Sequence, residues 1–296
     1  MAIDLSIITV NYNGLTDTCS LLDTIPFDGS LALEVIVVDN ASTADEATAI
    51  AERYPQVRVI RSQQNLGFAG GNNLGIRQAR GRYLYLVNND TLFCPFQVAP
   101  LISRLESSSA IGVVCPKIRF AWDDKPIQFA GYTRLSAITL RNHSIGYGED
   151  DHGQYASPHA TPYAHGAAMM LKREVVDRAG LMPECYFLYY EELDWSMLIR
   201  RAGYEIWYEP LATIYHKESQ TTGQHSPLKA YYITRNRLLF VKRNGEGLSK
   251  YCSYFYLICI ASLKDVVVNL LAGRLPQAAA TLRGAVHFLL NRQGKS

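Results

Sequence analysis

Short apolar runs alternate with amphipathic stretches along the first third of the chain. Four runs are brief, rich in β-branched or aromatic residues and largely apolar, which is typical of strands buried on both faces of a parallel sheet. They are Leu5–Val10, Glu34–Val38, Gln56–Ile60 and Tyr83–Val87. The stretches between them predict helices over residues 16–25, 45–54 and 71–79. Strands and helices that alternate at this pace predict an α/β fold, with a mostly parallel sheet flanked by helices.

The pattern changes after this region. Residues 120–165 are polar and rich in turn-forming residues, which predicts a long irregular segment of the kind that often carries substrate specificity. Regular structure is expected again over Ala164–Leu171, as a helix over Glu192–Ala202 and as a strand over Glu205–Tyr208. The remaining residues are helical and apolar in pattern. We therefore expect an α/β domain over residues 1–245 and a C-terminal helical segment over residues 246–296.

Polar clusters follow three of the predicted strands. They are Asn11-Tyr12-Asn13, Asp39-Asn40 and Asn88-Asn89-Asp90. Right-handed crossovers place the carboxyl ends of parallel strands at one edge of the sheet, where α/β folds bind ligands. A carboxylate at that edge suits a divalent cation that bridges a diphosphate, although Asp90 is also suited to a turn or a helix cap. This edge predicts a site for a nucleotide-activated substrate.

Several residues near this edge are suited to holding a nucleotide. The Tyr12 ring can stack on a base, the Asn13 amide can bond its edge or the ribose, and Asp39 can accept from a ring N–H or a ribose hydroxyl. The alternatives are ordinary strand-end packing, turn bonds and an N-cap. Residues 65–75 form a glycine- and amide-rich entry to a helix, where the backbone can approach a ligand closely. This segment matches neither GxGxxG nor the P-loop pattern.

Two further features bear on chemistry. His216 follows a late strand and is a candidate second metal ligand, with a structural histidine as the alternative. Glu191, Glu192 and Asp194 follow an aromatic run at residues 186–190. Crowding and burial would raise the pKa of one of these carboxyls toward the range of a general base. The alternative is that they complement the dipole at a helix N-terminus.

Composition narrows the class of protein. The chain has 296 residues, 48% hydrophobic and 19% charged, which is typical of a folded globular protein, and a net charge of +2 gives no reason to expect nucleic acid as a partner. Its six cysteines are scattered without a CxxC pair, so we expect reduced, buried thiols in the cytoplasm. The N-terminus lacks the pattern of a secretory signal, so the active part is expected to face the cytoplasm.

Taken in order, these segments resemble the family 2 glycosyltransferases with the GT-A fold, and most closely the bacterial rhamnosyltransferase-type enzymes of surface-polysaccharide synthesis. The resemblance covers roughly residues 4–245. Its motifs are Val10–Gly14, Val37–Ser42, Asn65–Gly67, Asn72–Gly75, Ala79–Tyr83, Leu86–Asp90, Gly166–Leu171, Tyr189–Trp195 and Arg200–Tyr204.

The resemblance implies roles for particular residues. Asp90 would be the surviving acid of the family's DxD element and His216 the histidine that completes a Mg²⁺ or Mn²⁺ site, while Asn88 replaces the first acid. Glu192 falls at the position of the catalytic base in place of the usual aspartate, so Asp194 remains a rival for that role. The expected nucleotide-sugar contacts are Tyr12, Asn13, Asp39, Asn65, Gly67, Asn72, Asn89 and Arg235, the last as a diphosphate clamp or as part of a basic helix surface.

The implied activity is inverting transfer of a sugar from a nucleotide-diphosphate donor to a saccharide acceptor, expected to be lipid-linked as in O-antigen synthesis. dTDP-L-rhamnose is the favoured donor, ahead of UDP-hexoses and UDP-galactofuranose. A nucleotidyltransferase would need a basic glycine-rich signature near the N-terminus, and the sequence has none. The remaining alternative is a non-catalytic member of the same fold that binds a nucleotide-sugar or acts as a scaffold.

The C-terminal segment has its own pattern. Two apolar runs, Tyr251–Leu263 and Val266–Leu271, are separated by Lys264-Asp265 and read as too short and too interrupted to span a membrane. They are bordered by basic residues: Arg243, Lys250, Arg274, Arg283 and Arg292. We expect amphipathic helices on the anionic inner face of the cytoplasmic membrane, with packing on the domain or on a second subunit as the alternative.

Overall fold

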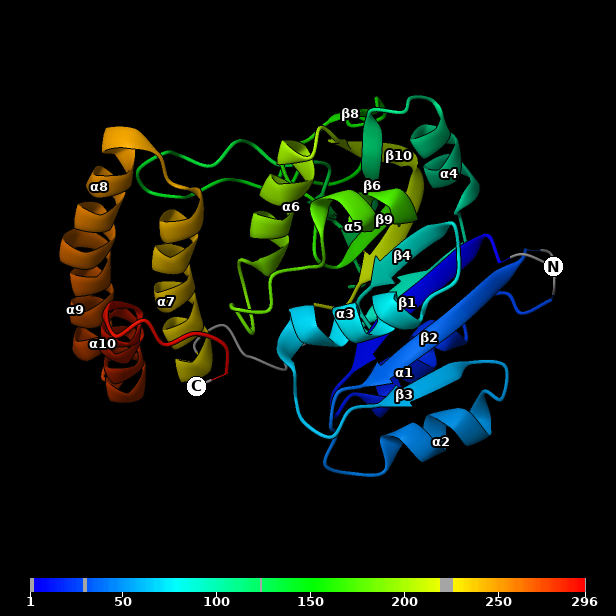
Figure 1. Ribbon diagram of the computed structural model, residues 1–296, viewed down its shortest axis with the longest axis horizontal. Helices are drawn as coiled ribbons and strands as arrows, with labels where there is room; N and C mark the ends of the chain where they lie inside the picture. The colour runs from blue at the N-terminus through cyan, green and yellow to red at the C-terminus, as the bar shows by residue number, and fades with distance from the viewer. Residues whose placement is uncertain (1–2, 29–30, 123, 219–225, 296) are drawn as a thin grey trace.

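The computed structural model describes residues 3–28, 31–122, 124–218 and 226–295. Its α/β part is built on one ten-stranded sheet flanked by helices, and a separate group of C-terminal helices lies beside it (Figure 1). The strands are β1 (Leu5–Asn11), β2 (Leu33–Asp39), β3 (Arg58–Arg61), β4 (Tyr83–Val87), β5 (Thr91–Phe93), β6 (Ile111–Phe120), β7 (Ile127–Phe129), β8 (His159–Ala160), β9 (Ala168–Lys172) and β10 (Glu205–His216).

The helices of the α/β part mostly follow the predicted positions. They are α1 (Leu15–Leu22), α2 (Glu46–Arg53), α3 (Gly67–Gln78), α4 (Ala99–Glu106), α5 (Arg173–Ala179) and α6 (Glu191–Arg201). Helix α3 begins at Gly67, earlier than the predicted Gly71, because side-chain amides satisfy its first backbone donors. Asn65 Oδ1 accepts from Gly67 N at 2.8 Å, and Asn40 Oδ1 accepts from Leu66 N at 2.9 Å.

The sheet divides into a parallel half and a mixed half. Strands β3, β2, β1 and β4 are neighbours in that order and all parallel, as predicted. The expected burial is wrong for β3, because it is the edge strand and its residues are exposed or only partly buried. Beyond β4 the order continues as β9, β6, β10 and β5, where β9 is antiparallel to both neighbours and β10 is parallel to β6. The expectation of a mostly parallel sheet therefore holds for the N-terminal half only.

Register at the parallel edge brings the predicted polar clusters together. Asn11 at the end of β1 is paired with Asp39 at the end of β2. Strand β4 lies on the other side of β1, and the Asn88–Asp90 segment follows it directly. Strand ends far apart in sequence thus form one polar edge above a core of fully buried side chains such as Ile7, Ile36 and Leu84.

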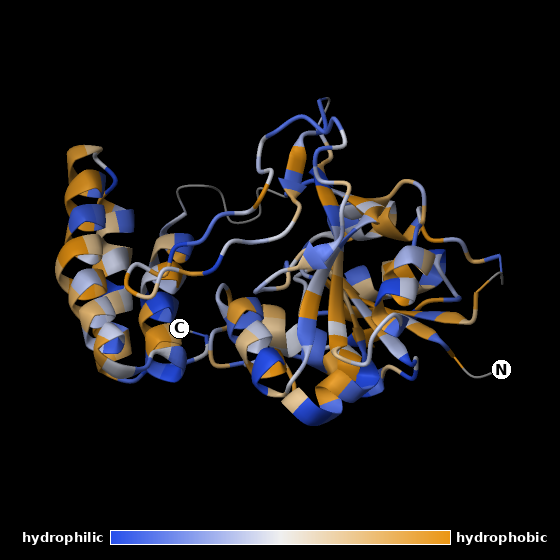
Figure 2. Cartoon of the chain, turned by 90° about the horizontal axis from the view of Figure 1, so that it is seen from above, coloured by the Kyte–Doolittle hydropathy of each residue, from blue (hydrophilic) through white to orange (hydrophobic). Residues whose placement is uncertain are grey.

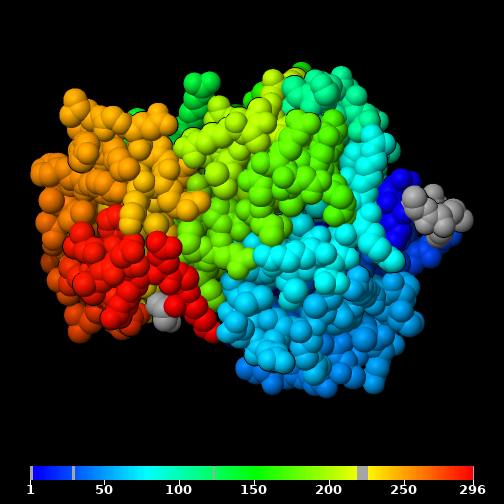
Figure 3. Space-filling view, viewed as in Figure 1, coloured from blue at the N-terminus to red at the C-terminus, as the bar shows by residue number. Residues whose placement is uncertain are grey.

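The C-terminal helices form a compact group. They are α7 (Pro227–Asn244), α8 (Gly247–Phe255), the π-helical stretch η2 (Tyr256–Ser262), α9 (Leu263–Leu271) and α10 (Leu275–Leu289). Helix α10 packs on α7 and α9, and α7 also meets α6 of the α/β part. Figure 3 shows this group, in orange and red, beside the green middle of the chain and away from the blue N-terminal strands. The expected division at residue 245 stays a prediction; it would separate α7 from α10, on which α7 packs.

The two apolar runs, Tyr251–Leu263 and Val266–Leu271, belong to one continuous helical stretch. Helices α8, η2 and α9 follow one another without a break from Gly247 to Leu271, a stretch of 25 residues that by length and composition could cross a membrane. The expectation of an interrupted segment that is too short is therefore wrong, because Lys264-Asp265 lies within the helix instead of ending it. Most of this helix is not buried within the protein, and its apolar residues are prominent in Figure 2.

All six cysteines are free, as expected. Cys19 and Cys115 are buried, but Cys94, Cys252 and Cys259 are exposed. The expectation of uniformly buried thiols is wrong because Cys252 and Cys259 lie on the outer surface of the C-terminal helices.

Candidate active site

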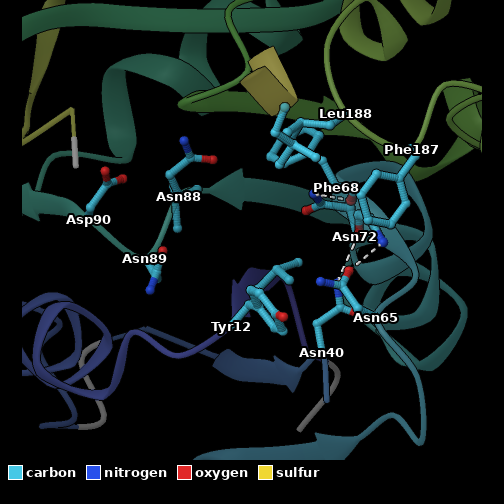
Figure 4. A pocket seen from close by; sticks show the side chains of 14 residues that line it. Tyr12, Asn40, Asn65, Phe68, Asn72, Asn88, Asn89, Asp90, Phe187 and Leu188 are labelled. Atoms are coloured by element: carbon cyan, nitrogen blue, oxygen red, sulfur yellow. Dashed lines mark hydrogen bonds between the residues drawn. The ribbon is translucent and has the colours of Figure 1, made fainter. Parts of the chain in front are cut away.

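A cleft of about 290 Å³ opens along the polar edge of the parallel half. Figure 4 shows Asp90 and Asn88 on one side of the cleft, Tyr12 near its middle, and Asn65, Asn72 and Phe187 on the other side. Its lining comes from six places in the chain: the ends of β1, β2 and β4, the start of α3, the segment before α6, and the start of α7. The lining residues are Val10, Tyr12, Asn40, Asn65, Gly67, Phe68, Asn72, Val87, Asn88, Asn89, Asp90, Phe187, Leu188 and Leu228.

Asp90 and His216 meet at the end of this cleft. Asp90 follows β4 and His216 ends β10, and the Lys217 backbone N–H donates to the Asp90 carbonyl at 2.9 Å, which holds the two segments together. His216 Nε2 lies 3.1 Å from Asp90 Oδ1, and both side chains are largely buried. His216 Nδ1 lies 2.8 Å from Gln128 Oε1. Because an amide oxygen can only accept, Nδ1 carries the proton of this bond, and a ring in its neutral form then has its lone pair on Nε2, toward Asp90.

This arrangement fits a divalent cation. A neutral imidazole lone pair and a carboxylate oxygen that face each other at hydrogen-bond distance are both cation donors, and the amide behind the ring supplies the partner that orients a ligating histidine. Among the described residues no group of three or more His, Cys, Asp or Glu side chains forms a metal cage. The protein therefore supplies a sparse donor set of the kind with which Mg²⁺ or Mn²⁺ keeps waters and substrate phosphates as further ligands.

The opposite end of the cleft is built from amides and aromatic rings. The Asn40 amide donates to Asn65 Oδ1 at 3.2 Å and to the Gly67 carbonyl at 3.1 Å, which ties the end of β2 to the start of α3. Gly67 has a φ of +73° and lies directly against the Phe187 carbonyl, so a Cβ there would collide with backbone. The Phe68 N–H donates to that same carbonyl at 2.9 Å. Residues 65–68 therefore hold Phe187 as a wall of the cleft.

Glu192, on the first turn of α6, is not among the described residues that line the cleft but lies behind one of them, Phe68. Gly166 separates it from the cleft residue Phe68, since a Cβ at Gly166 would lie 3.8 Å from both Glu192 Cγ and Phe68 Cζ. Burial raises the pKa of the Glu192 carboxyl. Burial raises the pKa of the neighbouring Glu191 still more, assisted by the charge of Glu192, and Glu191 Oε2 has no hydrogen-bond partner among the residues that the structure describes. A carboxyl whose pKa is raised by burial, such as that of Glu192, is suited to accepting a proton near neutral pH.

Asp194 has a different environment, although it is in the same helical turn. Its side chain is fully buried and accepts from Arg243 Nε, from Asn244 Nδ2 at 2.7 Å and from the Tyr186 hydroxyl at 3.1 Å. Both carboxylate oxygens are thus bonded to groups of α7 and of the segment before α6. The structure favours Glu192 over Asp194 as the proton acceptor.

Four predicted contacts have other partners in the structure. The Asn13 side chain accepts from Thr43 N and Oγ1, and Asp39 Oδ1 accepts from Asn11 Nδ2 and Ser42 Oγ, so both join the loops after β1 and β2. Neither lines the cleft. Asn89 lines it but directs its amide to Thr18 Oγ1 at 3.0 Å.

Arg235 differs most from its prediction. Its side chain is 1% exposed, and the guanidinium donates to the carbonyls of Tyr186 and Gly294, each at 2.7 Å. A diphosphate clamp would require these bonds to break, so the structure favours a role inside the protein. The alternative, a place on a basic helix surface, is wrong because Arg235 is buried, and the diphosphate clamp stays a prediction.

Sequence reasoning missed several residues of the site. Asn40, Phe187 and Leu188 belong to segments that were singled out, but their own side chains were not assigned to the cleft. Gln128 lies in a region expected to be irregular, and only the fold brings it to His216. Burial raises the pKa of the Tyr132 phenol, and the charge of Glu192 raises it further.

Comparison with known proteins gives the class of the chain. Residues 6–180 match the family model "Glycosyl transferase family 2". The chain is 27% identical to the "Low-salt glycan biosynthesis hexosyltransferase Agl10" of Haloferax volcanii, over 99% of this chain and 93% of that protein. It is 24% identical to the "N-acetylglucosaminyl-diphospho-decaprenol L-rhamnosyltransferase" of Mycobacterium tuberculosis, over 73% of this chain and 78% of that protein.

A solved structure shares the fold. The crystal structure of GalNAc-T7 with UDP, GalNAc and Mn²⁺ matches with a TM-score of 0.64 and 13% identity, over 92% of this chain and 58% of that one. The chain belongs to glycosyltransferase family 2, and its α/β part has the GT-A fold. It is a glycosyltransferase, as the resemblance read from its motifs implied.

Proposed function

We propose that this enzyme transfers a sugar, with inversion, from a nucleotide-diphosphate donor to a saccharide acceptor. The observation that carries the proposal is the Asp90–His216 pair at one end of a cleft whose opposite side adjoins Glu192. Asp90 and His216 would hold Mg²⁺ or Mn²⁺, which when bound neutralises the departing diphosphate. The Mn²⁺ in the GalNAc-T7 structure supports a divalent metal for this fold.

The reaction is a single displacement. The Glu192 carboxylate takes the proton of an acceptor hydroxyl while the acceptor oxygen forms a bond to the anomeric carbon. The bond from that carbon to the diphosphate oxygen breaks, and the nucleoside diphosphate leaves with the electron pair. Attack from the face opposite the leaving group inverts the anomeric configuration. Tyr12, Asn40, Asn65 and Asn72 lie where the nucleoside would stack and bond.

The favoured donor is dTDP-L-rhamnose, with UDP-hexoses and UDP-galactofuranose as alternatives. The support is the rhamnosyltransferase name of the mycobacterial relative, which also names a lipid-linked acceptor. A lipid-linked acceptor places the reaction at a membrane, and we assign residues 246–296 to contact with the inner face of the cytoplasmic membrane. Their exposed apolar side chains include Leu248, Phe255, Leu271, Leu275 and Leu289. This would be a step in cell-surface polysaccharide synthesis.

A panel of nucleotide-sugars tests this function. Purified enzyme is incubated with each donor, with Mn²⁺ or with EDTA, and the release of nucleoside diphosphate is measured together with the thermal shift. We expect one donor to give metal-dependent release and the largest stabilisation by binding. A non-catalytic scaffold would show a thermal shift without release. Absence of both for every donor would contradict the proposal.

A further inference from the structure

The segment that joins the cleft wall to Glu192 has an unusual backbone. Phe187, Tyr189 and Tyr190 have φ values of +69°, +69° and +78°, in the left-handed region that residues with side chains rarely adopt. Phe187 and Leu188 line the cleft, and Tyr190 is the N-cap of the helix that carries Glu192. We call residues 186–190 the strained segment. Its conformation sets both the donor side of the cleft and the position of the proposed base.

One side chain of α7 binds most of the strained segment. The Asn236 amide nitrogen lies 3.0 Å from the Tyr186 carbonyl, 2.7 Å from that of Leu188 and 3.0 Å from that of Tyr189. Asn236 is fully buried, and its Oδ1 accepts from Arg235 Nε at 2.9 Å. Because carbonyl oxygens that converge repel each other, the donor that they share holds them together, and its loss would leave the Leu188 and Tyr189 carbonyls without this bond.

Arg235 reinforces this arrangement. Its guanidinium bonds the Tyr186 carbonyl and the Gly294 carbonyl, and lies over the rings of Tyr231 and Tyr232 at 5.4 and 4.9 Å. The Gly294 N–H donates to the Cys185 carbonyl at 2.8 Å, next to the strained segment. The buried positive charge is thus directed at the carbonyl of Tyr186 in the strained segment and at that of Gly294 instead of at a substrate.

We propose that Asn236, held by Arg235, is a positioning residue of the transferase. It fixes the strained segment, and thereby both the cleft wall formed by Phe187 and Leu188 and the position of Glu192. The inference rests on the proposed function only for the role of Glu192. It also assigns a task to α7 that neither its basic sequence nor the family match reveals, since that match ends at residue 180.

Asn236→Asp is a sharp test because it keeps the shape and the acceptor for Arg235 but replaces the donor with an oxygen that faces three carbonyls. Gln78→Glu is the matched control, since Gln78 is exposed at the end of α3, does not line the cleft and, like Asn236, presents its amide oxygen to an arginine, Arg58. We expect kcat/KM to fall about 100-fold in Asn236→Asp, as for a small misplacement of reacting groups, and to remain unchanged in Gln78→Glu. Arg235→Lys keeps the positive charge but loses the guanidinium that bonds two carbonyls, so kcat/KM should fall less than in Asn236→Asp.

Three readouts separate positioning from a general loss of stability. Amide exchange of residues 186–190 should accelerate at least tenfold in Asn236→Asp while the central strands stay protected. Stabilisation by dTDP or UDP with Mn²⁺ should shrink. The acidic limb of the kcat/KM profile should move to lower pH, because Glu192, which lies beside Glu191 and near Tyr132, becomes better solvated. A fraction of unfolded enzyme would lower activity equally at every pH.

The possible failures are distinguishable. If the wild type processes no nucleotide-sugar, the proposed function fails, while amide exchange still tests the anchoring of residues 186–190. If the wild type is active and Asn236→Asp has the same exchange, nucleotide binding and turnover within twofold, the positioning role is wrong. A loss of activity that matches the unfolded fraction, with the pH limb unmoved, would also overturn it.

Discussion

The α/β part and the C-terminal helices place their apolar residues in opposite ways. Strands β1, β2 and β4 bury Ile7, Ile36 and Leu84 completely. Helices α8, α9 and α10 leave large apolar side chains outside, with Leu248 81% and Leu271 85% exposed. A core residue is buried by its own chain, whereas an exposed apolar surface of this extent points to a partner outside the described chain that covers it. In the function proposed above, the chemistry takes place at the sheet edge, and the helices determine where in the cell the enzyme is held.

The largest effect is expected at Glu192. Glu192→Gln removes the proton acceptor but keeps the size of the side chain, so transfer should fall about 1,000-fold while nucleotide binding is retained. Steady-state transfer and thermal shift with nucleoside diphosphate measure the two properties separately. Transfer within a few-fold of wild type would remove Glu192 from the mechanism.

Asp194 should show the reverse pattern. Asp194→Ala leaves the partly buried Arg243 without its carboxylate, and we expect a loss of about 3 kcal/mol in unfolding free energy, measured by denaturant titration. The matched control is Arg61→Ala, which breaks the exposed pair with Asp45 and should change stability by less than about 1 kcal/mol. If Asp194→Ala is as stable as wild type yet inactive, Asp194 is the base instead.

The helical surface gives a smaller effect, on location. Leu271→Glu replaces an exposed apolar side chain of α9 with a charged one and should weaken binding to anionic vesicles about 30-fold, since burying a leucine contributes about 2 kcal/mol. Leu211→Glu is the control, because Leu211 is 69% exposed but lies on β10 in the α/β part. Equal sedimentation of both variants with vesicles would contradict a membrane role. A Leu271→Glu variant that instead changes only the oligomeric state would favour a second subunit.

The smallest expected effect is on stability at Glu191. Its buried carboxyl has a pKa raised above the unfolded value, so the folded state favours the protonated form. Stability from this group is fully present below the unfolded pKa and is lost as pH rises toward the folded pKa. Glu191→Gln should therefore gain about 1 kcal/mol or more at pH 8 and much less at pH 4, by thermal unfolding. Exposed Glu52→Gln should gain at neither pH.

Much of the parallel half could be predicted because local pattern and environment agree there. The apolar runs of β1, β2 and β4 are buried on both faces, and the crossover rule alone brings Asp39 and Asp90 to one edge. The pairing of Asp90 with His216 followed from the family motifs, because nothing local to His216 distinguishes it from a structural histidine.

The rest depends on partners far away in the sequence. Strand β6 contains the buried Lys117. Its charge is compensated by an ion pair of 2.9 Å with Asp151, which lies far away in the sequence. Arg235 reads as a surface residue of a basic helix, because the carbonyls that bind it come from Tyr186 and Gly294. Positive φ values at Phe187, Tyr189 and Tyr190 have no signal in the sequence, since glycine is absent there.

The most direct measurement concerns Mn²⁺ at the sheet edge. Electron paramagnetic resonance counts free Mn²⁺ during titration of the enzyme with and without dTDP or UDP, in wild type and in the Asp90→Asn and His216→Gln variants. We expect Mn²⁺ to bind tightly only when the nucleoside diphosphate is present, and both variants to lose that binding. Wild-type Mn²⁺ binding in both variants would show that Asp90 and His216 do not hold the metal, and would contradict the assigned site.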